Sequence, residues 1–139
     1  MGFQSDTGDA HHRIFAGLTR WVNYRIRGVI TKRTAGGYSY ISFRVTDADN
    51  LYDQMIDEPG VRTTWHKTTA GVRTEIASAS LPAVELDTPY ELLADIRVEG
   101  ETNRARLYVD GVLYINTTDP DHASGMIGLN SYGEVTDFD

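Results

Sequence analysis

Apolar and polar residues alternate along most of this chain, and this two-residue period is the feature that most restricts its fold. The clearest run spans residues 38–46, where two sets of three alternate: Ile41, Phe43 and Val45 against Tyr40, Ser42 and Arg44. Successive side chains of a strand point to opposite faces, so we predict that the first set is buried and that the second set faces solvent. Helical periodicity is almost absent.

Further strands are expected between clusters of Gly, Pro, Asp and Asn. The predicted ranges are 13–16, 21–31, 51–57, 61–67, 72–79, 90–99, 104–109, 112–116, 126–131 and 135–138. Asp110-Gly111 joins two of them with the chemistry of a two-residue type I′ hairpin turn. Many short strands without helices predict an all-β fold of two packed antiparallel sheets. The 139 residues suit one domain spanning residues 1–139, with residues 1–12 as an arm or loop.

The composition excludes several classes of function. The chain has no cysteine, which rules out disulfides and thiolate chemistry. Its formal net charge of −7 repels phosphate backbones, so nucleic acid is not an expected partner. No apolar run is long enough for membrane insertion, and the first residues do not have the pattern of a signal peptide.

Several short segments occur in a fixed order along the chain: Phe43-Arg44, Asp47-Ala48-Asp49-Asn50-Leu51-Tyr52, Trp65-His66-Lys67 with Gly71, Tyr90-Glu91-Leu92, Arg106-Leu107-Tyr108-Val109-Asp110-Gly111, Ser124-Gly125-Met126-Ile127-Gly128-Leu129 and Phe138-Asp139. This ordered series resembles the concanavalin A-like lectin/glucanase superfamily, and within it the laminin-G-like jelly-roll modules. The similarity covers roughly residues 20–139. It implies a two-sheet antiparallel jelly-roll β-sandwich. Members usually extend beyond both ends of this chain, so an excised or compact domain is expected.

Catalytic signatures are missing from the sequence. Glycoside hydrolysis needs two carboxylates that flank the scissile bond. Related jelly-roll glucanases carry them in a Glu-x-Asp-x-x-Glu arrangement, which does not occur here. No nucleophile elbow and no phosphate-binding loop is found either. We therefore expect that the protein is not an enzyme.

Asp47 and Asp49 are candidate calcium ligands in the acidic stretch 47–50. Calcium prefers several oxygen ligands, and laminin-G-like modules often hold it on loops at the rim of a sheet. The alternative is that these residues only form a turn, because Asp and Asn bond readily to their own backbone.

A ligand-binding face is predicted around Tyr40, Arg44, Tyr52 and Trp65. Aromatic rings can stack on the C–H faces of sugars, and the arginine fork can donate to hydroxyl groups. The alternative is that these aromatic residues only cover neighbouring strands, which is common in sheets.

Together these observations predict a non-catalytic, lectin-like carbohydrate-binding module that takes a glycan or cell-surface polysaccharide. The alternative is a structural or adhesion domain that contacts other protein chains of a larger assembly, such as a phage tail or capsid protein or a bacterial surface protein. Either function implies an extracellular, virion or cell-surface location.

Overall fold

The computed structural model describes residues 3–4, 11–133 and 136–139, and within them every regular element is a strand. The strands are β1 (Phe3–Gln4), β2 (His11–Ala16), β3 (Tyr24–Lys32), β4 (Tyr38–Asp47), β5 (Asn50–Asp57), β6 (Arg62–Thr69), β7 (Val72–Ser80), β8 (Pro89–Glu99), β9 (Thr102–Val109), β10 (Val112–Asp119), β11 (Met126–Tyr132) and β12 (Thr136–Phe138). No helix of the described residues is long and apolar enough to cross a membrane.

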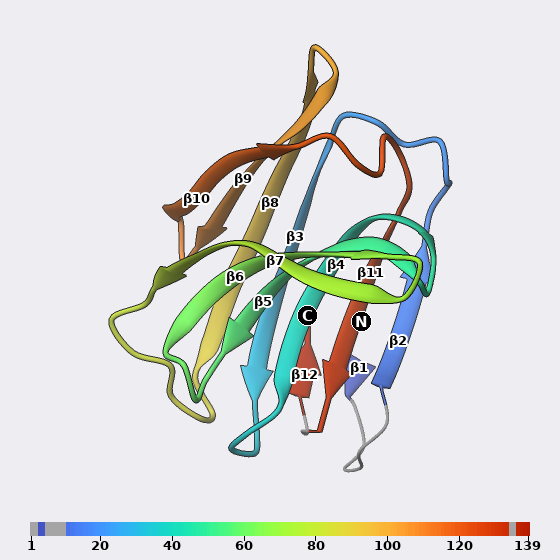
Figure 1. Ribbon diagram of the computed structural model, residues 1–139. Helices are drawn as coiled ribbons and strands as arrows, with labels where there is room; N and C mark the ends of the chain where they lie inside the picture. Colours follow the sequence, from blue (N-terminus) through green and yellow to red (C-terminus); the bar gives the residue numbers. More distant parts are fainter. Residues whose placement is uncertain (1–2, 5–10, 134–135) are drawn as a thin grey trace.

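The strands form two antiparallel sheets that pack face to face (Figure 1). Sheet A has the order β1-β12-β3-β8-β9-β10, and sheet B has the order β2-β11-β4-β5-β6-β7. Neighbours in each sheet are often far apart in sequence, as with β11 between β2 and β4. This arrangement confirms the predicted two-sheet antiparallel sandwich.

An aromatic cluster from sheet B fills the middle of the core. Phe43 lies directly opposite Tyr52 on the neighbouring strand, and their ring centroids are 5.7 Å apart. Trp65 from β6 continues the cluster, with its ring centroid 5.3 Å from that of Tyr52. Sheet A covers these rings with the apolar face of β8 and β9, which includes Ile96 and Leu107. The core therefore depends on the register between β4, β5 and β6.

Most strand predictions are confirmed, and the predicted inward set of β4 is buried as expected. The hairpin turn is also confirmed, since Asp110 and Gly111 have φ angles of 49° and 76°. The arm predicted for residues 1–12 is wrong in two places, because Phe3–Gln4 pairs with β12 and His11 begins β2. The rest of that arm and Val135 lie outside the described residues.

The predicted outward set of β4 is not open to solvent. Tyr40, Ser42 and Arg44 have exposed fractions of 3%, 0% and 0%. Strand β4 is central in sheet B, so long side chains from neighbouring strands cover its outer face. The alternation correctly predicted that Tyr40 and Ser42 lie on the outer face of the sheet, but the prediction that they are exposed was wrong.

Replacing Phe43 with Ala should lower the free energy of unfolding by about 3–5 kcal/mol, because the change opens a cavity in the aromatic cluster. Chemical denaturation measures this loss. Val72→Ala is the control, since Val72 is 67% exposed and its truncation should change stability by less than about 0.5 kcal/mol. A loss below about 1 kcal/mol for the Phe43 variant would contradict the assigned core.

Candidate functional site

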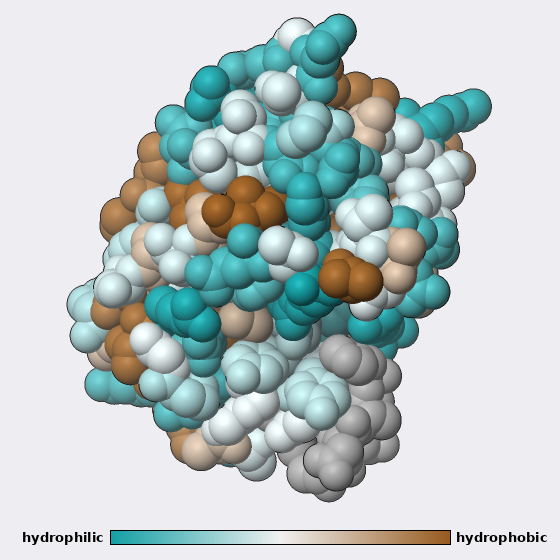
Figure 2. Space-filling model, viewed as in Figure 1, coloured by the Kyte–Doolittle hydropathy of each residue, from teal (hydrophilic) through white to brown (hydrophobic). Residues whose placement is uncertain are grey.

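A pocket of about 250 Å³ opens on the outer face of sheet B, away from the core. Its lining comes from six strands and one turn: Arg13, Tyr38, Tyr40, Leu51, Asp53, Thr68, Gly71, Arg73, Asn130 and Tyr132. In the view of Figure 2, hydrophobic residues form small separate areas within a mostly polar surface. A pocket that mixes tyrosines with charged and amide side chains suits a polar ligand.

Strand pairing positions these side chains. Asn130 of β11 lies opposite Tyr40 on one side and Arg13 on the other. On the next strand pair, Ser42 lies opposite Asp53. Residues directly opposite each other share one face of a sheet, so this register gathers the polar groups of four strands at one place.

Arg73 is held at the pocket wall by two neighbours, Tyr40 and Asp53. Its Nη1 donates a hydrogen bond of 3.0 Å to the Tyr40 hydroxyl, and its guanidinium carbon lies 4.5 Å from the centroid of that ring. Its Nη2 is 3.7 Å from an oxygen of Asp53. Burial raises the pKa of Tyr40 to about 12, so the phenol stays protonated near neutral pH. Arg73 still exposes 32% of its side chain, which leaves donors for a ligand.

Asp53 lies at the floor of the pocket and ends a short chain of hydrogen bonds. The Asn130 amide donates to the Ser42 hydroxyl, and that hydroxyl donates to Asp53. Burial raises the pKa of Asp53, whereas Arg73, Ser42 and Arg13 oppose this rise. The chain fixes the orientation of the carboxyl group and leaves its second oxygen directed toward Arg73.

Of the four predicted ligand-binding residues, only Tyr40 lines the pocket. Tyr52 and Trp65 are fully buried in the core, so their predicted outward orientation is wrong. The physical reason is register: Tyr52 pairs with Phe43, and Trp65 pairs with Gln54 on the same inner face.

The predicted exposure of Arg44 is also wrong, and a bulge in β4 explains its position. The pairing of β4 with β5 shifts between Phe43 and Asp47, and Arg44 has a φ angle of 56°. Its guanidinium is buried and donates to the carbonyl of Ala123 and, at 3.5 Å, to that of Trp21. Arg44 therefore fastens the loops before β3 and β11.

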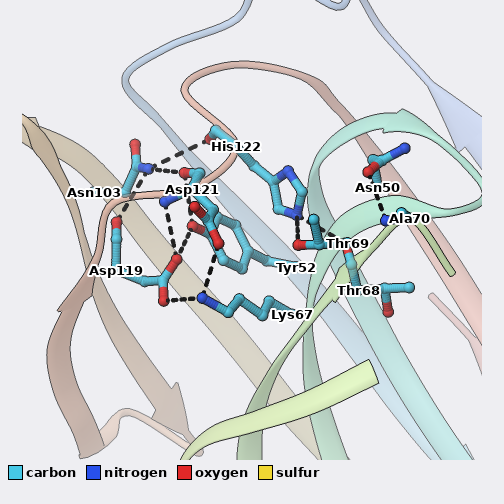
Figure 3. A network of polar contacts seen from close by, with 10 residues as sticks. All are labelled: Asn50, Tyr52, Lys67, Thr68, Thr69, Ala70, Asn103, Asp119, Asp121 and His122. Carbon is cyan, nitrogen blue, oxygen red and sulfur yellow. Dashed lines mark hydrogen bonds and ion pairs between the residues drawn. The ribbon is translucent and has the colours of Figure 1, made fainter. Parts of the chain in front are cut away.

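The ring of Tyr52 packs in the core, and its hydroxyl group has a separate structural role. Its hydroxyl donates bonds of 2.7 Å to the Asp119 carboxylate and to the Asp121 carbonyl (Figure 3). Lys67 bridges the carboxylates of the same two residues at 2.8 Å each. Although burial favours the neutral acid, the bonds from Lys67 and Tyr52 hold the pKa of Asp119 below its usual value. This network fastens the chain between β10 and β11 to the core.

Asp47 and Asp49, the candidate calcium ligands, both lie in the turn between β4 and β5. The Asp47 carboxylate accepts bonds from the Asp49 backbone N–H at 2.8 Å and from the Asn50 amide at 3.0 Å. The described residues contain no group of three or more acidic, His or Cys side chains suited to a metal ion. The turn-forming role is thus observed, and calcium binding stays a prediction.

Sequence reasoning missed Arg13, Asp53, Arg73 and Asn130. They come from four strands, and only the pairing of those strands brings them together. A partial signal was present, because Asp53 interrupts an apolar stretch in a central strand. A charged residue in such a place needs a partner or a function.

Comparisons with known proteins identify solved structures with a similar fold. No protein-family model matches the sequence, and no curated protein matches it significantly. Carbohydrate-binding module CBM66 from Bacillus subtilis superposes with a TM-score of 0.83 at 23% identity, over 99% of this chain and 88% of that one. The galectin LEC-6 from Caenorhabditis elegans superposes with a TM-score of 0.59 at 14% identity, over 98% and 95%.

The chain has the concanavalin A-like lectin/glucanase fold. A third match is the GH43 protein BlXynB from Bacillus licheniformis, with a TM-score of 0.59 at 16% identity. The alignment covers 84% of this chain and 26% of that protein. At these identities the likeness is one of fold, and the narrower laminin-G-like assignment stays a prediction.

Replacing Arg44 with Ala should lower the free energy of unfolding by about 2–4 kcal/mol, because truncation leaves a cavity and removes the donor from two carbonyls. Denaturant titration measures the loss. Arg27→Ala is the control, because that side chain is 68% exposed and should matter little. An Arg44 variant as stable as the control would contradict the fastening role.

His66 should make stability fall as the pH is lowered. Burial lowers its pKa from 6.5 to about 4, so below about pH 6.5 the unfolded chain takes up a proton that the folded chain does not. Between about pH 7 and about pH 5.5, this residue should remove about 1 kcal/mol of stability. His66→Gln should lack this contribution in parallel denaturation curves. Equal pH dependence in the two proteins would contradict the assignment.

Proposed function

We propose that this protein is a non-catalytic carbohydrate-binding module whose ligand occupies the pocket on the outer face of sheet B. The observation that carries the proposal is the lining itself. Tyrosine rings stand beside one buried carboxyl group, one amide and two guanidinium groups. This combination suits a sugar, which presents apolar C–H faces and a ring of hydroxyls.

Each part of the lining has a task in this proposal. Tyr38 and Tyr132 supply flat, amphipathic surfaces at the rim, at a low entropy cost. Arg73 donates to sugar oxygens, and Asp53 accepts from sugar hydroxyls. Both groups are already oriented by their neighbours, so little ordering is required when the ligand binds.

The absence of catalysis is part of the proposal, because the pocket lacks the required pair of groups. Among the described lining residues, Asp53 is the sole carboxylate. Glycoside hydrolysis ordinarily requires two carboxyl groups on opposite sides of the bond. The similar fold of CBM66 supports binding, although part of a GH43 protein also has a similar fold.

A glycan array followed by calorimetry tests the proposal. Arg73→Ala should weaken binding of the best glycan by about tenfold or more, since truncation removes charge-assisted donors from the pocket. Arg104→Ala is the matched control: it lies on the outer face of sheet A, and its side chain is 30% exposed, close to the 32% of Arg73.

The control should bind as well as the unmodified protein, and melting temperatures should show that both variants are folded. Absence of binding to every glycan at millimolar concentration would refute the proposal. Equally weakened glycan binding in both variants would mean that the glycan does not bind specifically in this pocket. Release of reducing sugar from a bound polysaccharide would refute the non-catalytic assignment.

The assembly role within a larger protein remains the alternative prediction. Virion genes beside this one would favour it, whereas neighbouring glycosidase genes would favour glycan binding.

A further inference from the structure

The charge of the pocket lining differs in sign from that of the whole chain. The chain has a formal net charge of −7. The lining contains the guanidinium groups of Arg13 and Arg73 against the carboxyl group of Asp53. Both cations lie close enough to Asp53 to favour its charged form. A positive excess is thus concentrated around one buried acid.

The two guanidinium groups have more donors than the described residues use. Each arginine carries five N–H donors in a planar fork. Arg13 is exposed and donates one bond of 2.8 Å, from Nη1 to the Ala48 carbonyl. Arg73 donates to the Tyr40 hydroxyl and makes a weak contact of 3.8 Å with the Met55 sulfur. The remaining N–H groups suit a carboxylate, which accepts two parallel bonds from such a fork.

The floor of the pocket offers acceptors instead of donors. Asn130 is 3% exposed, and its Oδ1 has no hydrogen-bond partner among the described residues. A buried acceptor without a partner is costly, so a ligand donor that reaches it would be favoured. Asp53 lies nearby and shares the hydrogen-bonded chain through Ser42. Acceptors at the floor suit the hydroxyl groups of a sugar.

We propose that the pocket selects an acidic sugar, a uronic acid or a similar saccharide that bears a carboxylate. The inference rests on the proposed glycan-binding function and specifies its ligand. The carboxylate of the sugar pairs with Arg13 and Arg73, while its hydroxyls donate to Asp53 and Asn130. A neutral sugar can donate to the floor but brings no carboxylate to the remaining N–H groups of the two arginines.

Asp49 provides an opposing charge near the rim. Its carboxylate oxygen is 3.6 Å from the position that a Cβ on Gly71 would take, and Gly71 lines the pocket. This charge should repel an acidic ligand and leave a neutral one nearly unaffected. Removal of the charge therefore distinguishes the two ligand classes.

The experiment compares matched pairs of ligands by calorimetry: methyl glucuronide with methyl glucoside, and a galacturonate oligosaccharide with its galactose counterpart. Each acid should bind about tenfold or more tightly than its neutral partner, and added salt should weaken only the acids. R13Q and R73Q should each reduce this preference. D49N should strengthen binding of the acids by about threefold and leave the neutral sugars unchanged.

The outcomes separate this inference from the proposed function. Neutral sugars that bind as tightly as their acids would overturn the acidic ligand while glycan binding stands. A preference for the acids that R13Q and R73Q leave unchanged would also overturn it. If no saccharide of either class binds at millimolar concentration, both proposals fail. If R104Q weakens binding of the acids as much as R73Q does, the acids bind through general surface charge. This result would overturn the assignment of the carboxylate to the pocket.

Discussion

The rest of the structure depends on the packing of Phe43 against Tyr52, two residues of sheet B whose rings lie in the core. The two residues are directly opposite each other on β4 and β5. Because side chains alternate along a strand, their neighbours Ser42 and Asp53 must then point to the outer face. A shift of one residue in this register would bury the acid in the core and expose the aromatic rings. The same contact that stabilises the sandwich thus directs the candidate site toward solvent.

Tyr52 and Arg44 connect this core to the loops by hydrogen bonds. The Tyr52 ring packs in the aromatic cluster, while its hydroxyl binds the segment that leads to β11. Arg44 follows the core residue Phe43, but the bulge turns its side chain toward the loop at Ala123. β11 supplies Asn130 to the pocket, so loops held at one end of the sandwich help to position a site on its face. The buried polar groups of Tyr52 and Arg44 therefore position loops and strands without lining the pocket.

The fold alone does not decide between a binding module and an enzyme, because it superposes on CBM66 and also on part of a GH43 protein. The distinction depends on the groups that converge in the pocket. Among the described lining residues Asp53 is the sole carboxyl group, and under the proposed function it orients a sugar, whereas glycoside hydrolysis ordinarily requires two carboxyl groups. The acidic composition of the whole chain does not give the local charge of the pocket, because Arg13 and Arg73 both act on Asp53 there.

The sequence by itself determined the strands, the inner face of β4 and the Asp110-Gly111 turn, because alternation and turn chemistry act between near neighbours. It did not determine which face Tyr52 and Trp65 occupy. Both residues are amphipathic and suit either side of a strand, so the pairing of β5 and β6 with β4 decided their burial. The pocket was likewise beyond local reasoning. Its arginines come from strands at opposite edges of sheet B, and only tertiary pairing brings them to one acid.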